Sequence, residues 1–288
     1  MEKRTIMQVM KGTVENFGDQ TALKTKINGN WEAITWQSYY DQVRTTARAF
    51  MALGLEESNA ISILGNNCPQ WFISNMAAIF AGGIPGGIYA TNSPEQCHYI
   101  AHHSQAAIVV VENEEQLAKF KIIRQDLPGL KAIVMMTGAD ADENIFSWDD
   151  LTGIAAKTSE EALDNRMAVQ KPDDCCSLIY TSGTTGNPKG VMLSHDNIIW
   201  TGQQVVDAVK ADHTDHLISY LPLSHIAEQI VSLYIPTITG STSWFAESLD
   251  LLGSNLTEVH PTIFVGVPRV WEKIQAKMTA AGAHNSGL

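Results

Sequence analysis

Short apolar stretches alternate with helical stretches along most of the chain, and this alternation constrains the fold more than any other feature. Strands are expected at residues 60–64, 107–111 and 131–136, with segments of helical apolar spacing between them. Strands separated by helices form parallel βαβ units. The uninterrupted apolar run at 108–111 is typical of a strand covered on both faces of its sheet. The sequence therefore predicts an α/β fold with largely parallel sheets.

The rest of the chain continues the alternation. Further strands are expected at 87–90, 177–180, 217–220, 241–246 and 262–267, and helices at 38–53, 69–81, from Ser93 onwards, 114–125, 226–235, 249–259 and 269–281. Residues 140–171 are more polar and less periodic. We therefore expect a boundary near Pro172, with an N-terminal α/β subdomain at 1–171 and a second one at 172–288.

Composition excludes several classes of protein. The formal net charge of −12 argues against a nucleic-acid partner, because phosphate backbones are bound by basic surfaces. The N-terminus does not resemble a signal peptide, and no segment has the roughly 18 apolar residues of a spanning helix. The four cysteines lack zinc or redox spacing and indicate buried thiols in a reducing compartment. These features predict a cytoplasmic protein and leave peripheral membrane contact open.

A loop rich in glycine and hydroxyl residues follows the strand expected at 177–180. Two glycines let the backbone approach a ligand closely, successive amides in such a turn bind anions, and the hydroxyls add donors. A lysine adds positive charge after a proline that stiffens the exit. The spacing differs from Walker, Rossmann and nucleophile-elbow motifs. The expected ATP-phosphate site consists of Thr181, Ser182, Gly183, Thr184, Thr185, Gly186, Asn187, Pro188 and Lys189.

Three stretches together resemble motifs of the AMP-forming acyl-CoA synthetase superfamily, which also holds firefly luciferase and the adenylation domains of peptide synthetases. They lie at 180–195, 219–228 and 264–273, and the resemblance covers nearly the whole chain. Residues 65–71 and 87–93 are most similar to the bubblegum-type long- and very-long-chain branch. The resemblance implies a layered α-β-α-β-α arrangement, the N-terminal part of an adenylate-forming fold.

The resemblance also implies a chemistry. A fatty-acid carboxylate attacks the α-phosphate of ATP, and the thiol of coenzyme A then displaces AMP from the acyl-AMP. Thr181 would contact Mg²⁺, and residues 182–186 with Lys189 would hold the phosphates. His225 would lie near the substrate carboxylate and the α-phosphate. The catalytic residues implied are therefore His225 and Lys189, with ATP, Mg²⁺ and coenzyme A as cofactor and co-substrates.

Several histidines and one glutamate have simpler interpretations. His225 is read either as a positioning residue of the site or as a capping or core histidine. Glu228 shares a helical face with His225, and we expect it to form a salt bridge or a cap rather than a metal site. His98, His102 and His103 are expected on a solvated helix surface.

The superfamily pattern includes later motifs that are not found in these residues. They are a glutamate motif for Mg²⁺, an aspartate motif for the ribose, and a mobile C-terminal lid domain with a catalytic lysine. We therefore expect an N-terminal portion of a longer ligase, inactive without its missing C-terminal part. A non-catalytic nucleotide-binding module, and adenylation of a different acid of the luciferase or aryl kind, stay open as alternatives.

Overall fold

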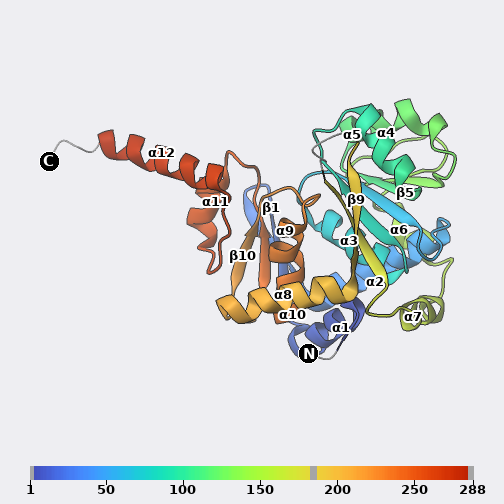
Figure 1. The fold of residues 1–288 in the computed structure, drawn as a ribbon, viewed down its shortest axis with the longest axis horizontal. Helices are drawn as coiled ribbons and strands as arrows, with labels where there is room; N and C mark the ends of the chain where they lie inside the picture. Colours follow the sequence, from blue (N-terminus) through green and yellow to red (C-terminus); the bar gives the residue numbers. More distant parts are fainter. Residues whose placement is uncertain (1–2, 182–186, 285–288) are drawn as a thin grey trace.

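The strands of the protein form two sheets, seen in a computed structural model that describes residues 3–181 and 187–284 (Figure 1). A seven-stranded sheet has the order β7-β6-β5-β3-β4-β8-β9, and a four-stranded sheet has the order β10-β11-β1-β2. The strands are β1 (Thr21–Ile27), β2 (Asn30–Thr35), β3 (Ala60–Leu64), β4 (Ile84–Ile88), β5 (Ala106–Val111), β6 (Ala132–Met135), β7 (Ile145–Ser147), β8 (Cys175–Thr181), β9 (Lys189–Ser194), β10 (His216–Ser219) and β11 (Thr242–Phe245).

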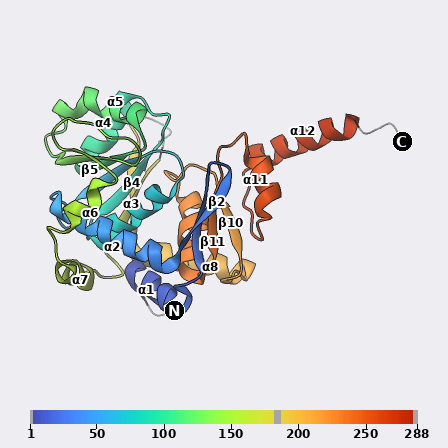
Figure 2. The same ribbon diagram turned by 180° about the vertical axis from the view of Figure 1, so that it is seen from behind.

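Helices connect most of these strands. They are α1 (Ile6–Phe17), α2 (Trp36–Ala52), α3 (Pro69–Phe80), α4 (Pro94–His103), α5 (Glu114–Ile123), η1 (Arg124–Asp126), α6 (Asp150–Ala155), α7 (Glu160–Ala168), α8 (His195–Val209), α9 (Ile226–Glu228), η2 (Gln229–Tyr234, a π-helix), α10 (Ile235–Thr239), α11 (Leu252–Val259) and α12 (Pro268–His284). Figures 1 and 2 show α12 extending away from both sheets. No helix in the described ranges has the length and apolarity needed to cross a membrane.

The seven-stranded sheet is covered on both faces. Ile108 and Val110 face a core shared with α2 and α3, whereas Val109 and Val111 face a second core with α4 and α5. Successive side chains of a strand point to opposite faces, so an all-apolar strand needs a helical layer on each side. All pairings are parallel except the β1–β2 and β8–β9 hairpins. The predicted α/β fold with layered helices and largely parallel sheets is confirmed.

Two features of the chain organisation differ from the sequence-based expectation. The strand predicted at 262–267 is wrong, because that segment makes a single bridge, between Leu217 and Ile263, and then leaves the sheet. The hairpin of β1 and β2 was not expected, and it pairs with β11 across more than half the chain. Each sheet therefore takes strands from both sides of residue 171, although the division of the chain into 1–171 and 172–288 stays a prediction.

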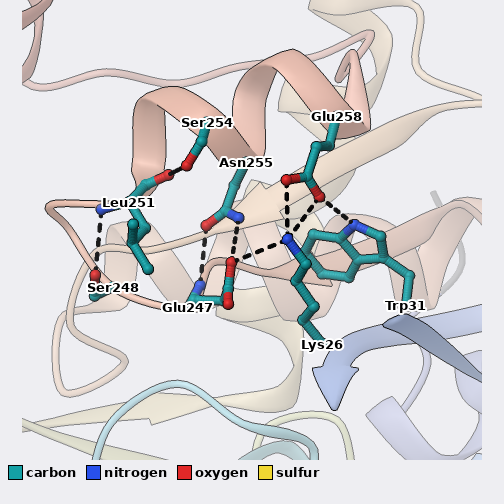
Figure 3. A network of polar contacts seen from close by, with 8 residues as sticks. All are labelled: Lys26, Trp31, Glu247, Ser248, Leu251, Ser254, Asn255 and Glu258. Carbon is teal, nitrogen blue, oxygen red and sulfur yellow. Dashed lines mark hydrogen bonds and ion pairs between the residues drawn. The ribbon is translucent and has the colours of Figure 1, made fainter. Parts of the chain in front are cut away.

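Polar contacts fasten the N-terminal segments to the later part of the chain. The buried His195 ring at the start of α8 accepts a hydrogen bond from the Ile6 amide at 3.2 Å, and burial lowers its pKa to about 4. Near α11, the Lys26 ammonium lies 2.8 Å from Glu258, whose carboxylate also accepts from the Trp31 indole at 2.9 Å (Figure 3). These contacts hold α1 and the β1–β2 hairpin in place.

Gly240 allows the close packing of α10 on α1. Its φ of +83° lies in the left-handed region, and a Cβ atom there would overlap the Phe17 ring. We expect Gly240→Ala to lower the free energy of unfolding by about 3 kcal/mol, through backbone strain and overpacking. Gly12 in α1 has open space around its Cβ position, so the control Gly12→Ala is expected to raise stability by up to about 1 kcal/mol. Urea denaturation measures both, and equal effects of the two variants would contradict this assignment.

Candidate active site

A cavity of about 480 Å³ lies between the two sheets, at the carboxyl ends of their strands. It is lined by residues of the segments that follow five strands, including Asn67 after β3, Tyr89 after β4, Glu112 after β5, Tyr220 after β10 and Glu247 after β11. Ligands of open α/β sheets bind where the carboxyl ends of parallel strands diverge. This position makes the cavity, here called the inter-sheet cleft, the candidate active site.

The two ends of the predicted phosphate loop lie side by side. Thr181 ends β8 and pairs with Lys189, which begins β9. Because β8 runs parallel to β4, Thr181 lies at the same edge of the sheet as the inter-sheet cleft. Both side chains are exposed, as is that of Asn187, while Pro188 is half-buried. Ser182, Gly183, Thr184, Thr185 and Gly186 lie outside the described residues, so their predicted role in phosphate binding stays a prediction.

His225 caps the helix that follows the cleft wall. Its Nδ1 atom accepts a hydrogen bond from the Ala227 amide at 3.2 Å, and the side chain is exposed. The turn before it packs directly on β4, since a Cβ on Gly87 would come within 2.6 Å of the Ser224 Cα atom. The contact that His225 makes is therefore a helix cap, which is one of its two expected roles. A catalytic role of His225 stays a prediction.

Glu228 is a buried carboxylate behind the cleft wall, with 3% of its surface exposed. Its Oε1 atom accepts hydrogen bonds from the Ser219 hydroxyl (2.8 Å), the Ser232 hydroxyl (2.7 Å) and the Tyr220 amide (3.1 Å). Among the described residues it has no cationic partner, so of the two expected roles, a salt bridge or a cap, the salt bridge is wrong. Neutral donors surround the carboxylate instead, and burial raises its pKa to about 7.

Asn67 joins this cluster from the other sheet. Its side-chain amide donates to the Ser219 hydroxyl at 2.8 Å and to the Leu221 carbonyl at 2.7 Å, with Glu228 at 3.5 Å. The strand-end segments of β3 and β10 are therefore fastened to each other at the cleft. Asn67 was not among the predicted site residues, although it lies in the 65–71 stretch that carries the family resemblance.

The histidines of α4 lie at the surface of the helix and contact different neighbours. His102 and His103 are exposed, as expected, and His98 contacts the Asp126 carbonyl at 3.3 Å. His103 also contacts the Tyr180 hydroxyl at 2.9 Å, which helical spacing did not reveal. In the ranges 3–181 and 187–284, no group of three or more His, Cys, Asp or Glu side chains is arranged to hold a metal ion.

Sequence comparison matches most of the chain to one enzyme family. A model of the AMP-binding enzyme family matches residues 10–287. The chain is 45% identical to the long-chain-fatty-acid–CoA ligase ACSBG2 of Xenopus laevis and 44% identical to ACSBG1 of Bos taurus, covering 99% and 98% of this chain. It spans about 40% of the length of each of these relatives.

Solved structures share the fold at lower identity. An anthranilate–CoA ligase, AuaEII, with anthranoyl-AMP superimposes with a TM-score of 0.82 at 23% identity, covering 93% of this chain and 51% of that one. A putative long-chain-fatty-acid–CoA ligase of Rhodopseudomonas palustris gives 0.80 at 18% identity, covering 96% and 66%. The two-sheet arrangement is thus that of adenylate-forming ligases.

The raised pKa of Glu228 has a measurable effect on stability. The folded protein keeps a proton on this carboxyl up to about pH 7, whereas the ordinary value is 4.5. The stabilisation is therefore complete below pH 4.5 and is lost as the pH rises through 7, by about 3 kcal/mol. We expect the free energy of unfolding of the wild type, relative to Glu228→Gln, to fall by about that amount between about pH 5 and 8. A difference that stays constant with pH in urea titrations would contradict the assignment.

Proposed function

This chain belongs to the AMP-binding enzyme family, and we propose that the whole protein activates a long-chain fatty acid with ATP and transfers it to coenzyme A. The observation that carries the proposal is the family match over residues 10–287, together with a phosphate-loop sequence whose ends lie at the same edge of the seven-stranded sheet as the inter-sheet cleft. The names of the relatives support the choice of acid. Because the chain spans about 40% of those relatives, the activity is proposed for the whole protein.

In the first step, a carboxylate oxygen of the fatty acid attacks the α-phosphorus of ATP, and pyrophosphate leaves. Fatty acids have a pKa of about 4 to 5, so the nucleophile is already ionised at neutral pH and needs no general base. The protein must instead neutralise phosphate charge and align the two reactants. The exposed ammonium of Lys189 at the start of β9 is suited to the first task.

Thr181 fits the role of a Mg²⁺ contact. Thr181 is exposed at the end of β8 beside Lys189, so its hydroxyl would offer Mg²⁺ a hard oxygen ligand next to the phosphate site. Mg²⁺ in nucleotide sites is commonly held by one or two protein oxygens, by phosphates and by water. When bound, the ion would withdraw charge from the phosphate oxygens.

His225 would act by position. It caps α9 at the end of the turn that forms one wall of the inter-sheet cleft, and Glu228 fixes that turn from behind.

In the second step, the sulfur of coenzyme A attacks the acyl carbonyl carbon, the thiol gives up its proton, and AMP leaves. A cytoplasmic location with peripheral membrane contact belongs to the proposal, because long acyl chains partition into membranes.

Lys189→Ala in the whole protein tests the phosphate site. We expect ATP–pyrophosphate exchange driven by a long-chain fatty acid to fall by about tenfold or more, since each tenfold loss corresponds to about 1.4 kcal/mol of lost charge stabilisation. Lys157→Ala is the matched control, because Lys157 is exposed near α6 and makes no ion pair with a described residue. Unchanged exchange kinetics in Lys189→Ala would remove Lys189 from the phosphate site.

A further inference from the structure

We propose that Tyr99 and His103, one turn apart on α4, are positioning residues for the ATP phosphate site. They keep Thr181 and Lys189 paired with each other, so that both side chains are in place for the phosphates of ATP. This pair, here called the α4 brace, contacts both ends of the segment that carries the phosphate-loop sequence. The proposal rests on the proposed function, because it assigns the brace to the ATP site of that reaction.

Each brace residue contacts the neighbour of one loop end. The Tyr99 hydroxyl donates a hydrogen bond to the Pro188 carbonyl at 3.0 Å, next to Lys189. The His103 Nδ1 atom lies 2.9 Å from the Tyr180 hydroxyl, next to Thr181. The Tyr99 and His103 rings stack on each other with centroids 5.5 Å apart and planes inclined by 26°. One helix thus fixes both ends of the hairpin opening.

The hairpin needs such support because β9 is an edge strand. In the described residues, β9 pairs with β8 alone. The last pair of this ladder joins Thr181, at the end of β8, to Lys189, at the start of β9. Pro188 has no amide hydrogen and therefore cannot extend the ladder between β8 and β9. Its carbonyl oxygen can still accept a hydrogen bond that holds the start of β9 in place. Without the Tyr99 hydrogen bond, the Lys189 backbone would be free to fray from β8.

The helix that carries the brace is itself well anchored. Ser93 and Gln96 form a capping box at its start, and Cys97, Ile100 and Ala101 are buried in the core. On the strand side, the Gly190 Cβ position lies 3.3 Å from the Tyr180 ring, so ring and strand are in close contact. The brace is therefore a rigid link between a fixed helix and the loop ends.

The brace residues do not belong to the inter-sheet cleft. Tyr99 lines an adjacent cavity of about 450 Å³, which is also lined by Tyr180, Asn187 and Pro188 and shares Tyr89 with the cleft. Neither Tyr99 nor His103 lines the larger cleft between the sheets. Their effect on the reaction therefore passes through the placement of Thr181 and Lys189.

The test is Tyr99→Phe, which removes one hydroxyl and keeps the stacked ring. In the whole protein we expect KM for ATP in pyrophosphate exchange to rise about threefold to tenfold, the effect of one hydrogen bond, with KM for the fatty acid unchanged. In the ligand-free 288-residue chain, backbone amides of β9 should exchange hydrogen faster, whereas those of β3 and β5 should not. Tyr39→Phe is the control, because it removes a buried hydroxyl on α2 that has no hydrogen-bond partner among the described residues.

The outcomes separate the two proposals. A wild-type whole protein without fatty-acid-dependent exchange would overturn the proposed function, and the amide-exchange measurement would still test the brace. An active wild type with unchanged KM for ATP in Tyr99→Phe would overturn the brace. Equal changes in both KM values and in kcat would also overturn it, because they indicate a general loss of structure. If Tyr99→Phe does not fold, His103→Phe provides the same test from the Tyr180 side.

Discussion

The parallel pairing of strands is the constraint on which the rest of the structure depends. Because parallel strands end at the same edge, the segments after β3, β4, β5, β10 and β11 all meet at one cleft between the sheets. The β8–β9 hairpin joins the same edge through the parallel pairing of β4 with β8. Residues from both halves of the chain thereby line one cleft, and the ends of the phosphate-loop sequence lie at the same edge of the sheet.

The alternation of strands and helices could be predicted from the sequence, because a strand that is buried on both faces appears as a continuous apolar run. The strand at Ala60–Leu64 was predicted with its observed bounds, and most others within a few residues. Pairing across the chain was not readable, because a hairpin such as β1–β2 carries no local signal for the partner it finds at β11. The segment at 262–267 has the composition of a strand, yet sheet pairing is decided by neighbours rather than by propensity.

The sequence indicated which types of residue belong to the candidate site, but not the contacts that they make. The loop chemistry was inferred from residue types and the role of His225 from the family resemblance, whereas Asn67 and the donors around Glu228 come from separate elements. No spacing rule connects Asn67 to Ser219, because their proximity follows from the packing of one sheet on the other. A buried carboxylate without a cation lowers stability at neutral pH, and such groups cluster at functional sites.

The central claim is that the fatty-acid carboxylate attacks the α-phosphorus of ATP. The most direct measurement supplies the whole protein with ATP, coenzyme A and a long-chain fatty acid carrying ¹⁸O in its carboxyl group, and analyses the nucleotide product by mass spectrometry. We expect AMP that contains one ¹⁸O atom, because the attacking oxygen stays on phosphorus when coenzyme A takes the acyl group. ADP with labelled inorganic phosphate would show attack at the γ-phosphate and would contradict the account.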